Sequence, residues 1–279
     1  MIKASLLFLF LSMVPHAAQA SAILTPETCT SIALGVAQFG TVLTVASQLG
    51  SFFAPKTILN LYKAPTGPMN THLMRFVGTA GLAYAIILVC SLFFNMSYTS
   101  AVGYSLVPWI ASGVRDAVAR VDKSLGLHPI NFMFNLLMGP LIAYVCLYGT
   151  EYYADLVARV FGGFMTLNGL TMTFATDSHV KAWGGNTPDN EPILSSSLRT
   201  FGLHMLAYGL LMEALQSGMN VVPALGLTWV FLAACPVLPL LSSTAKKFKL
   251  SAKLLVALTL PNAIIIGGTA LYYVEHKSS

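Results

Sequence analysis

The chain has 279 residues, of which 56% are hydrophobic and only 9% charged, whereas soluble globular chains carry about 25% charged residues. Together with a mean hydropathy of +0.72, this composition excludes an ordinary soluble globule and indicates a membrane protein. The net charge of +5 does not indicate nucleic-acid binding, because the basic residues lie in short loops between apolar segments instead of on one soluble face.

Residues 1–20 have the features of a signal peptide. One lysine precedes an apolar run from Leu6 to Val14, and Ala18-Gln19-Ala20 then gives the small-x-small pattern that signal peptidase accepts. The run is shorter than the ~20 residues that a membrane span requires, which favours cleavage over the alternative, an uncleaved first anchor. We therefore expect the mature chain to begin near Ser21 on the non-cytosolic side.

Eight apolar segments long enough to cross a bilayer follow the signal peptide. They lie at residues 31–54, 73–95, 97–114, 130–150, 152–174, 199–219, 220–242 and 252–274. Glycine and proline interrupt the third segment, and Asp155 and Arg159 lie in the fifth, so a tilted or partial helix is the alternative for these two. We expect an all-α polytopic membrane protein of about eight transmembrane helices.

The distribution of lysine and arginine agrees with this count, since short cytosolic loops carry an excess of both residues. With the mature N-terminus outside, 12 of the 14 mature basic residues fall on the cytosolic side. Both mature termini are then non-cytosolic. We expect an endomembrane or the plasma membrane; a plastid membrane is the alternative, because Ala20-Ser21-Ala22 resembles the signal junction of proteins sent to complex plastids, although Ile23 follows where those have an aromatic residue.

One ten-residue pattern occurs twice. "RFVGTAGLAY" begins at Arg75 and "RTFGLHMLAY" at Arg199, and Arg, Gly, Leu, Ala and Tyr occupy the same positions in both. We interpret this as a tandem duplication of a four-span unit, with a first copy at 21–150 and a second at 151–279. A chance match between apolar helices is the alternative. Because four is even, both copies have one orientation, and an axis along the membrane normal relates them.

Upstream of the pattern, Gly50-Ser51-Phe52 is similar to Gly162-Gly163-Phe164 at an offset of 112, whereas the offset at the pattern itself is 124. The second copy is therefore expected to carry a 12-residue insertion. We place it in a surface loop near 176–198, which is rich in Gly, Pro, Asn and Asp.

Arginine and glycine share one helix face in each copy, since Arg75 and Gly78, like Arg199 and Gly202, are spaced i, i+3. An arginine at the interface can reach lipid phosphate or a helix C-terminus, and glycine lets helices approach closely. We interpret these four residues first as a packing and anchoring device, with an anionic ligand as the alternative.

Each copy contains a Gly-x-Phe segment, a following Leu-x-Leu-Tyr or its counterpart, and then Arg-x-x-Gly-x-x-x-Leu-Ala-Tyr. This arrangement resembles the small four-span membrane proteins of the DoxX-like superfamily, in which an arginine followed by a small residue opens the second helix. The resemblance implies a four-helix fold for each half. Some members are associated with quinone-linked oxidation and most have no known activity, so the resemblance carries over only the paired Arg and Gly positions.

Ionisable residues inside apolar segments are costly and are therefore functional candidates. Glu213 is the strongest, as a candidate general acid or base. We expect Arg159 to compensate its charge, with Asp155 on the same helical stripe as Arg159 and Gln216 one turn from Glu213. Structural ion pairing is the alternative. His204 lies nine residues before Glu213, about 180° around the helix, so a hydrogen-bonded structural role is favoured over ligand binding.

The four cysteines, Cys29, Cys90, Cys146 and Cys235, lack the spacing of a zinc site, so we expect buried free thiols and no metal. No sequence signature identifies a cofactor or a reaction. Three hypotheses remain: a membrane-embedded binder or carrier of a small lipophilic or amphipathic molecule, a membrane enzyme such as an isomerase, cyclase or quinone-linked oxidoreductase, and a non-catalytic subunit with membrane-protein partners. The lipid bilayer is the partner common to all three.

Overall fold

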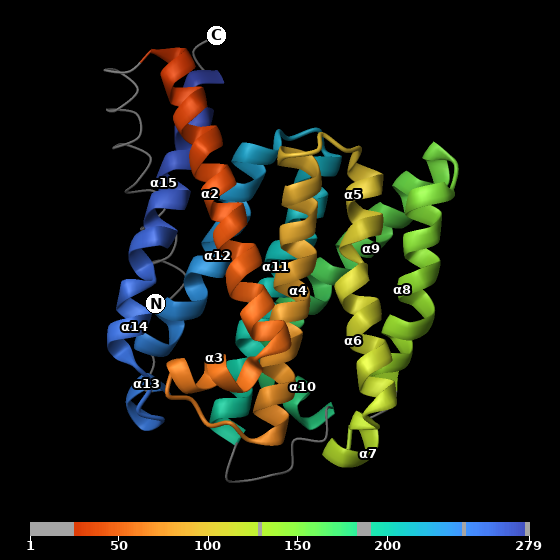
Figure 1. Ribbon diagram of the computed structural model, residues 1–279, viewed down its shortest axis with the longest axis vertical. Coiled ribbons are helices and arrows are strands. Elements are labelled where there is room, and N and C mark those ends of the chain that lie inside the picture. Colours follow the sequence, from red (N-terminus) through yellow and green to blue (C-terminus); the bar gives the residue numbers. More distant parts are fainter. Residues whose placement is uncertain (1–24, 128–129, 183–190, 242–243, 277–279) are drawn as a thin grey trace.

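The computed structural model describes residues 25–127, 130–182, 191–241 and 244–276 (Figure 1). Every regular element in these ranges is a helix, which confirms the predicted all-α fold. The predicted signal peptide at residues 1–20 lies outside the described residues.

The described helices follow local sequence signals. Proline occupies the first turn of α2, α3 and α4, where its missing N–H costs no helical hydrogen bond, and Thr25 and Ser97 cap α2 and α5 with their side-chain oxygens. In chain order the helices are α2 (Pro26–Phe53), α3 (Pro55–Leu61), α4 (Pro68–Leu92), α5 (Tyr98–Ser105), α6 (Val107–Val118), α7 (Val121–Leu125), α8 (Ile130–Tyr148), α9 (Glu151–Phe174), α10 (Thr176–Ala182), α11 (Glu191–Gln216), α12 (Val221–Leu241), α13 (Thr244–Lys247), α14 (Ala252–Ala257) and α15 (Thr259–His276).

The protein is an integral membrane protein, because four of the described helices are long and apolar enough to cross a bilayer. They are Glu27–Phe53, Pro68–Leu92, Val221–Leu241 and Ala252–Tyr272. The other four predicted segments also fold as helix. These four do not meet the same criterion of length and hydropathy, for three reasons. Charged residues lower the hydropathy of α9 and of α11. The third segment is divided into two short helices, α5 and α6, and the apolar part of α8 is too short. The count of eight spans therefore stays a prediction.

Helices α4 and α11 pack against each other at the centre of the molecule (Figure 1). In the first half, taken as residues 25–148, α2 and α5 pack beside α4; in the second half, residues 151–276, α9 and α12 pack beside α11. At the periphery α15 packs against α2, and α8 packs against α9. The first helix of each half is thus covered by the last helix of the other half.

The repeated arginine makes the same contact in both halves. The Nε of Arg75 donates to the carbonyl oxygen of Phe52 at 3.1 Å, and the Nε of Arg199 donates to that of Thr173 at 3.2 Å. Each acceptor lies in the last turn of the preceding long helix, where carbonyls lack helical partners. The arginine therefore ties the second long helix of its half to the end of the first.

The repeated glycine lies at the same crossing. A Cβ added at Gly78 would lie 2.5 Å from the backbone nitrogen of Phe52, and one added at Gly202 would lie 2.8 Å from the Cβ of Met172. Neither position has room for a larger residue. The Arg and Gly of the pattern thus form one packing device, which agrees with the first interpretation of these residues.

The tyrosine that closes the pattern reaches into the other half. The hydroxyl of Tyr84 is 2.8 Å from the hydroxyl of Thr228 in α12, and the hydroxyl of Tyr208 is 2.6 Å from that of Ser105 in α5. Both tyrosines are completely buried. The two hydrogen bonds are reciprocal and cross the seam between the halves in opposite directions.

The helix ends place the halves in a different register from the Gly-x-Phe match. α2 and α9 end at the equivalent C-caps Ala54 and Ala175, an offset of 121, so the pairing at an offset of 112 is wrong. Arg75 follows Ala54 by 21 positions and Arg199 follows Ala175 by 24, so the second half is longer by three residues here, not by 12. Glycine and phenylalanine are common in apolar helices, and the short match coincides by chance.

The region near 176–198, expected as an inserted surface loop, contains α10 and the first part of α11. Residues 183–190 between these two helices lie outside the described residues. The described part of the region is therefore helical.

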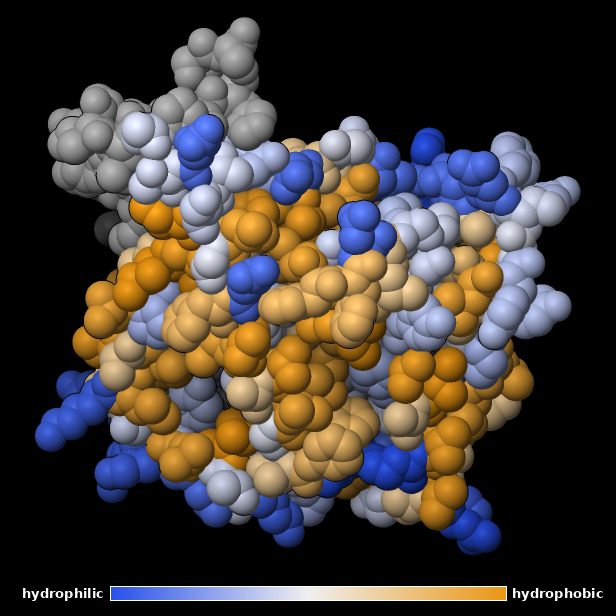
Figure 2. Space-filling model, turned by 45° about the horizontal axis from the view of Figure 1, so that its top comes forward, coloured by the Kyte–Doolittle hydropathy of each residue, from blue (hydrophilic) through white to orange (hydrophobic). Residues whose placement is uncertain are grey.

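Large apolar side chains are exposed along α2, α8 and α9, among them Phe39, Leu137, Tyr144, Val160 and Leu167. Figure 2 shows apolar residues over most of the visible face, with hydrophilic residues concentrated toward its edges and a few among the apolar ones. Because lipid chains are as apolar as these side chains, this distribution fits direct contact with a bilayer.

The short helices α3, α7, α10 and α13 lie at one end of the molecule, the bottom in Figure 1. They carry Lys56, Lys123, Lys181, Lys246 and Lys247, so we call this the basic end. α5 and α9 begin, and α8 and α11 finish, at the opposite end.

Candidate functional site

A cleft of about 540 Å³ opens at the end opposite the basic end. Helices α5 and α8 of the first half and α9 and α11 of the second half supply its walls, so we call it the interhalf cleft. Its lining residues are Ser97, Tyr98, Thr99, Ser100, Cys146, Leu147, Gly149, Glu151, Ala154, Asp155, Leu215 and Gln216. Hydroxyl, carboxylate and amide groups therefore share this space with apolar side chains, and no lysine or arginine lines it.

Two of the predicted site residues, Asp155 and Gln216, line the interhalf cleft, and a third, Arg159, pairs with one of them. Asp155 lies in the second turn of α9, and Gln216 is the last residue of α11. The amide Nε2 of Gln216 donates to the Oδ1 of Asp155 at 3.0 Å. Arg159 pairs with the Oδ2 of Asp155 at 3.5 Å, with a side chain that is 62% exposed. The carboxylate of Asp155 thus bonds through one oxygen to the half-buried amide of Gln216 and through the other to the exposed guanidinium of Arg159.

Glu213 lies on α11 three residues before Gln216 and does not line the interhalf cleft. Its Oε1 is 2.8 Å from the position of a Cβ added at Gly162 in α9, so the carboxylate occupies the space that this glycine leaves. Among the described residues Arg159 pairs with Asp155 and not with Glu213. The compensating pair that we expected between Glu213 and Arg159 is therefore absent.

His204 is buried and hydrogen-bonded on both ring nitrogens. Its Nδ1 is 2.9 Å from the carbonyl oxygen of Thr200, which only accepts, and its Nε2 is 3.3 Å from the amide nitrogen of Gln48, which only donates. Nδ1 therefore carries the proton and the ring is neutral. The bond to Gln48 joins α11 to α2, as expected of a structural histidine, and His204 does not line the cleft.

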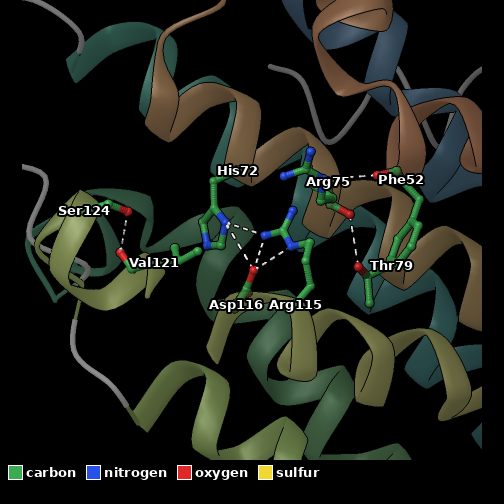
Figure 3. A network of polar contacts seen from close by, with 8 residues as sticks. All are labelled: Phe52, His72, Arg75, Thr79, Arg115, Asp116, Val121 and Ser124. Atoms are coloured by element: carbon green, nitrogen blue, oxygen red, sulfur yellow. Dashed lines mark hydrogen bonds and ion pairs between the residues drawn. The ribbon is translucent and has the colours of Figure 1, made fainter. Parts of the chain in front are cut away.

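A second polar cluster lies at the basic end and was not predicted (Figure 3). His72 and Arg75 come from α4, and Arg115 and Asp116 from α6. The Nε of Arg115 donates to the Oδ1 of Asp116 at 2.9 Å, and a terminal nitrogen of Arg115 contacts the same oxygen. In Figure 3 the Arg115 guanidinium lies between Asp116 and Arg75. We call these four residues the basic-end cluster.

Burial governs the protonation of this cluster. Asp116 is 1% exposed and His72 is 4% exposed. Burial raises the pKa of the Asp116 carboxyl above its ordinary value, and the hydrogen bond and charge of Arg115 oppose this shift. The Nη2 of Arg115 is 3.3 Å from the Nδ1 of His72, and because a guanidinium has no acceptor, His72 accepts there and carries its proton on Nε2.

The halves differ in the residues at equivalent positions of both sites. Equivalence here follows the helix ends and the reciprocal tyrosine bonds. At the basic end, Leu238 and Pro239 stand in α12 where α6 has Arg115 and Asp116. At the opposite end, Leu34 and Leu92 stand where the interhalf cleft has Asp155 and Gln216. Two residues of each polar site, Arg115 with Asp116 and Asp155 with Gln216, therefore have apolar residues at the equivalent positions of the other half.

All four cysteines are free thiols, and three of them are buried. The described residues contain no group of three or more His, Cys, Asp or Glu side chains that could hold a metal ion. Neither observation adds a reactive centre to the two polar sites.

No known protein-family model, curated protein or solved structure matches this chain. The two polar sites therefore have to be interpreted from their own chemistry.

Proposed function

We propose that the protein binds or carries a small amphipathic or lipophilic molecule in the interhalf cleft. The observation that carries the proposal is the cleft itself, whose volume of about 540 Å³ falls within the range of about 300–1,000 Å³ typical of small-molecule sites. It lies between the halves, and ligand sites are frequent where structural units meet.

The lining indicates what kind of molecule fits. Glu151 and Asp155 are its only charged residues, and four hydroxyl side chains from Ser97 to Ser100 face the same space. Leu147 and Leu215 add apolar surface. A ligand with a hydrogen-bond donor, such as an amine or hydroxyl, can bond through that group to the carboxylates and pack its apolar part against the leucines.

The position of Glu213 supports binding better than catalysis. Its carboxylate packs against Gly162 and does not line the cleft, and a general acid or base has to reach the proton that it transfers. The enzyme and subunit hypotheses are therefore secondary to the binding hypothesis.

We also propose that each half is a DoxX-like four-helix unit, fused in tandem, and that the chain enters the membrane through its signal peptide with eight spans and the basic end in the cytosol. The matched Arg, Gly and Tyr contacts of the two halves support the duplication. The lysines of α3, α7, α10 and α13 support the orientation. An endomembrane or the plasma membrane fits this route.

The test is native mass spectrometry with lipid extraction of the purified protein. The double variant Asp155→Leu and Gln216→Leu installs the leucines that the first half has at the equivalent positions, Leu34 and Leu92. We expect the unaltered protein to carry a small molecule that the double variant lacks at equal protein yield. Lys123→Gln, at the basic end, is the control and keeps the molecule. Retention by the double variant, or no small molecule on the unaltered protein, contradicts the proposal.

A further inference from the structure

One face of α5 and α6 carries a line of polar side chains. Tyr98, Ser105, Trp109, Ser112 and Asp116 follow one another at intervals of seven, four, three and four residues, which places all five on one helical stripe. The residue that joins the two helices keeps a right-handed helical backbone, so the stripe continues across the junction. At 1.5 Å per residue the stripe is about 27 Å long.

The stripe faces the interior of the protein. Ser105 is completely buried, Ser112 and Asp116 are each 1% exposed, and Trp109 is 4% exposed. Polar groups are seldom placed in such a line inside a membrane protein, where apolar side chains pack at no desolvation cost. Their arrangement therefore needs a reason beyond packing.

Helices α5 and α6 also carry polar atoms that lack hydrogen-bond partners in the protein. Six buried side-chain nitrogen or oxygen atoms of the described residues have no hydrogen-bond partner, and three of them lie on α5 and α6: the hydroxyl of Tyr98, the Nε1 of Trp109 and the Nη1 of Arg115. A buried polar atom without a protein partner is typically bonded to water. Half of the unpartnered atoms thus belong to residues of α5 and α6.

The two ends of the stripe coincide with the two polar sites. Tyr98 lines the interhalf cleft, and Asp116 belongs to the basic-end cluster. Between them the hydroxyl of Tyr208 bonds to that of Ser105 and adds a polar group from α11. Polar atoms therefore run from one end of the molecule to the other.

The second half has no such line. Val221, Leu232, Cys235 and Pro239 stand in α12 at the positions equivalent to Tyr98, Trp109, Ser112 and Asp116. The nearby indole of Trp229, which is 4% exposed like that of Trp109, donates to the Oδ1 of Asn262 at 2.8 Å. The two tryptophans are thus equally buried, and only the indole nitrogen of Trp229 has a hydrogen-bond partner in the protein.

We propose that α5 and α6 line a water-containing polar path that connects the interhalf cleft with the basic-end cluster and gives water and protons access to Asp116. The path needs no ligand in the cleft, so this inference stands apart from the proposed function. Water at Trp109 and Arg115 supplies the acceptors that the protein does not, and Tyr98 and Ser112 offer further hydrogen bonds along the way.

The test compares two indole protons in the protein reconstituted in lipid nanodiscs. With ¹⁵N-labelled tryptophan, Trp109→Phe and Trp229→Phe assign the two indole signals, and transfer to D₂O measures their exchange with water. We expect the proton of Trp109 to exchange faster than that of Trp229 by about tenfold, the factor that a hydrogen bond of ~1.4 kcal/mol supplies. Equal exchange of the two protons overturns the proposal.

A pair of matched variants then locates the water. Ser112→Leu places an apolar side chain in the path and is expected to slow exchange at Trp109 to the rate of Trp229. Cys235→Leu makes the same change at the equivalent position of the second half and leaves Trp109 unchanged. Fast exchange at Trp109 in Ser112→Leu contradicts a path along α5 and α6. If Ser112→Leu does not fold, the comparison of Trp109 with Trp229 in the unaltered protein still decides the question.

Discussion

At the basic end of the first half, Arg75 bonds to the end of α2 and lies beside the half-buried Arg115 and the buried Asp116. At the basic end of the second half, Arg199 bonds to the equivalent carbonyl of α9 but is exposed, and Leu238 occupies the place of Arg115. The contact that holds the helices is common to both halves, and the buried charges occur in only one. This difference separates the helix-packing contacts common to both halves, which we call the frame, from the polar residues that occur in one half and form a site.

The opposite end reverses the comparison. There the second half carries Asp155 and Gln216, and the first half has Leu34 and Leu92 at the equivalent positions. Neither half is simply the more polar one. Each half keeps the frame and has its own polar site, and the stripe on α5 and α6 connects the two sites.

The largest expected effect belongs to the pair of Arg115 and the buried Asp116. Arg115→Met leaves the carboxylate of Asp116 buried without its main partner, and losses of this kind cost about 3–5 kcal/mol of stability. Leu238→Met, at the equivalent position of the second half, changes volume little and costs under about 1.5 kcal/mol. Thermal unfolding in detergent measures both. The double change Arg115→Met with Asp116→Leu should recover most of the loss, and equal effects of the two single variants would show that the pair adds nothing.

The next effect tests the frame itself. Gly78→Ala and Gly202→Ala each place a Cβ against the backbone or Cβ of the neighbouring helix, and overpacking of this kind costs about 1–3 kcal/mol. Both halves should respond alike. Gly35 and Gly267 are the controls, since nothing lies within 4 Å of a Cβ added at either, and alanine there should be neutral or stabilising. A large loss in only one half would break the equivalence of the two crossings.

The repeated arginines should respond in the same direction but not equally. Arg75→Gln removes the bond to Phe52 from a half-buried site, and a hydrogen bond involving a charged group contributes about 1.5 kcal/mol at the lower end of its range. Arg199→Gln removes the equivalent bond at an exposed site, where water replaces it more readily, so its loss is smaller. Unfolding midpoints of the two variants, measured together, give the order. A greater loss for Arg199 would contradict this account of the pair.

The smallest effect is expected at the seam. Tyr84→Phe and Tyr208→Phe each remove one reciprocal hydrogen bond, and each should cost about 1 kcal/mol. The hydroxyls of Thr228 and Ser105 keep bonds to backbone carbonyls of their own helices, so neither is left without a partner. Equal losses, measured by thermal unfolding, support a seam with two equivalent bonds. If one of the two variants lost no stability, the two hydrogen bonds would not be equivalent.

Composition and periodicity were enough to predict the helical membrane fold and the face that carries Arg75 and Gly78, because both depend on spacing along one helix. The reciprocal bonds of Tyr84 and Tyr208 could not be predicted, since the packing of distant helices decides which hydroxyl each tyrosine meets. The predicted alignment of α2 with α9, at an offset of 112, was wrong because it used a short match of residues that are common in apolar helices. The ends of the two helices align them more reliably, at an offset of 121.

The sites divide in the same way. The stripe of Asp155 and Arg159 follows from their i, i+4 spacing. The partner of Glu213 depends on the rotation of α11 against α9, which the sequence does not specify. Asp116 was not singled out because it lies just beyond the third apolar segment, yet an acid next to Arg115 at the end of a span is a signal worth testing.

The most direct test of the account is an electron cryomicroscopy map of the protein purified in native-lipid nanodiscs, inspected at two equivalent places. The account predicts non-protein density for one small molecule in the interhalf cleft beside Asp155 and Gln216, and no matching density beside Leu34 and Leu92. An interhalf cleft without such density, or the same lipid density at both places, would contradict the claim that one symmetric frame carries a single specialised binding site there.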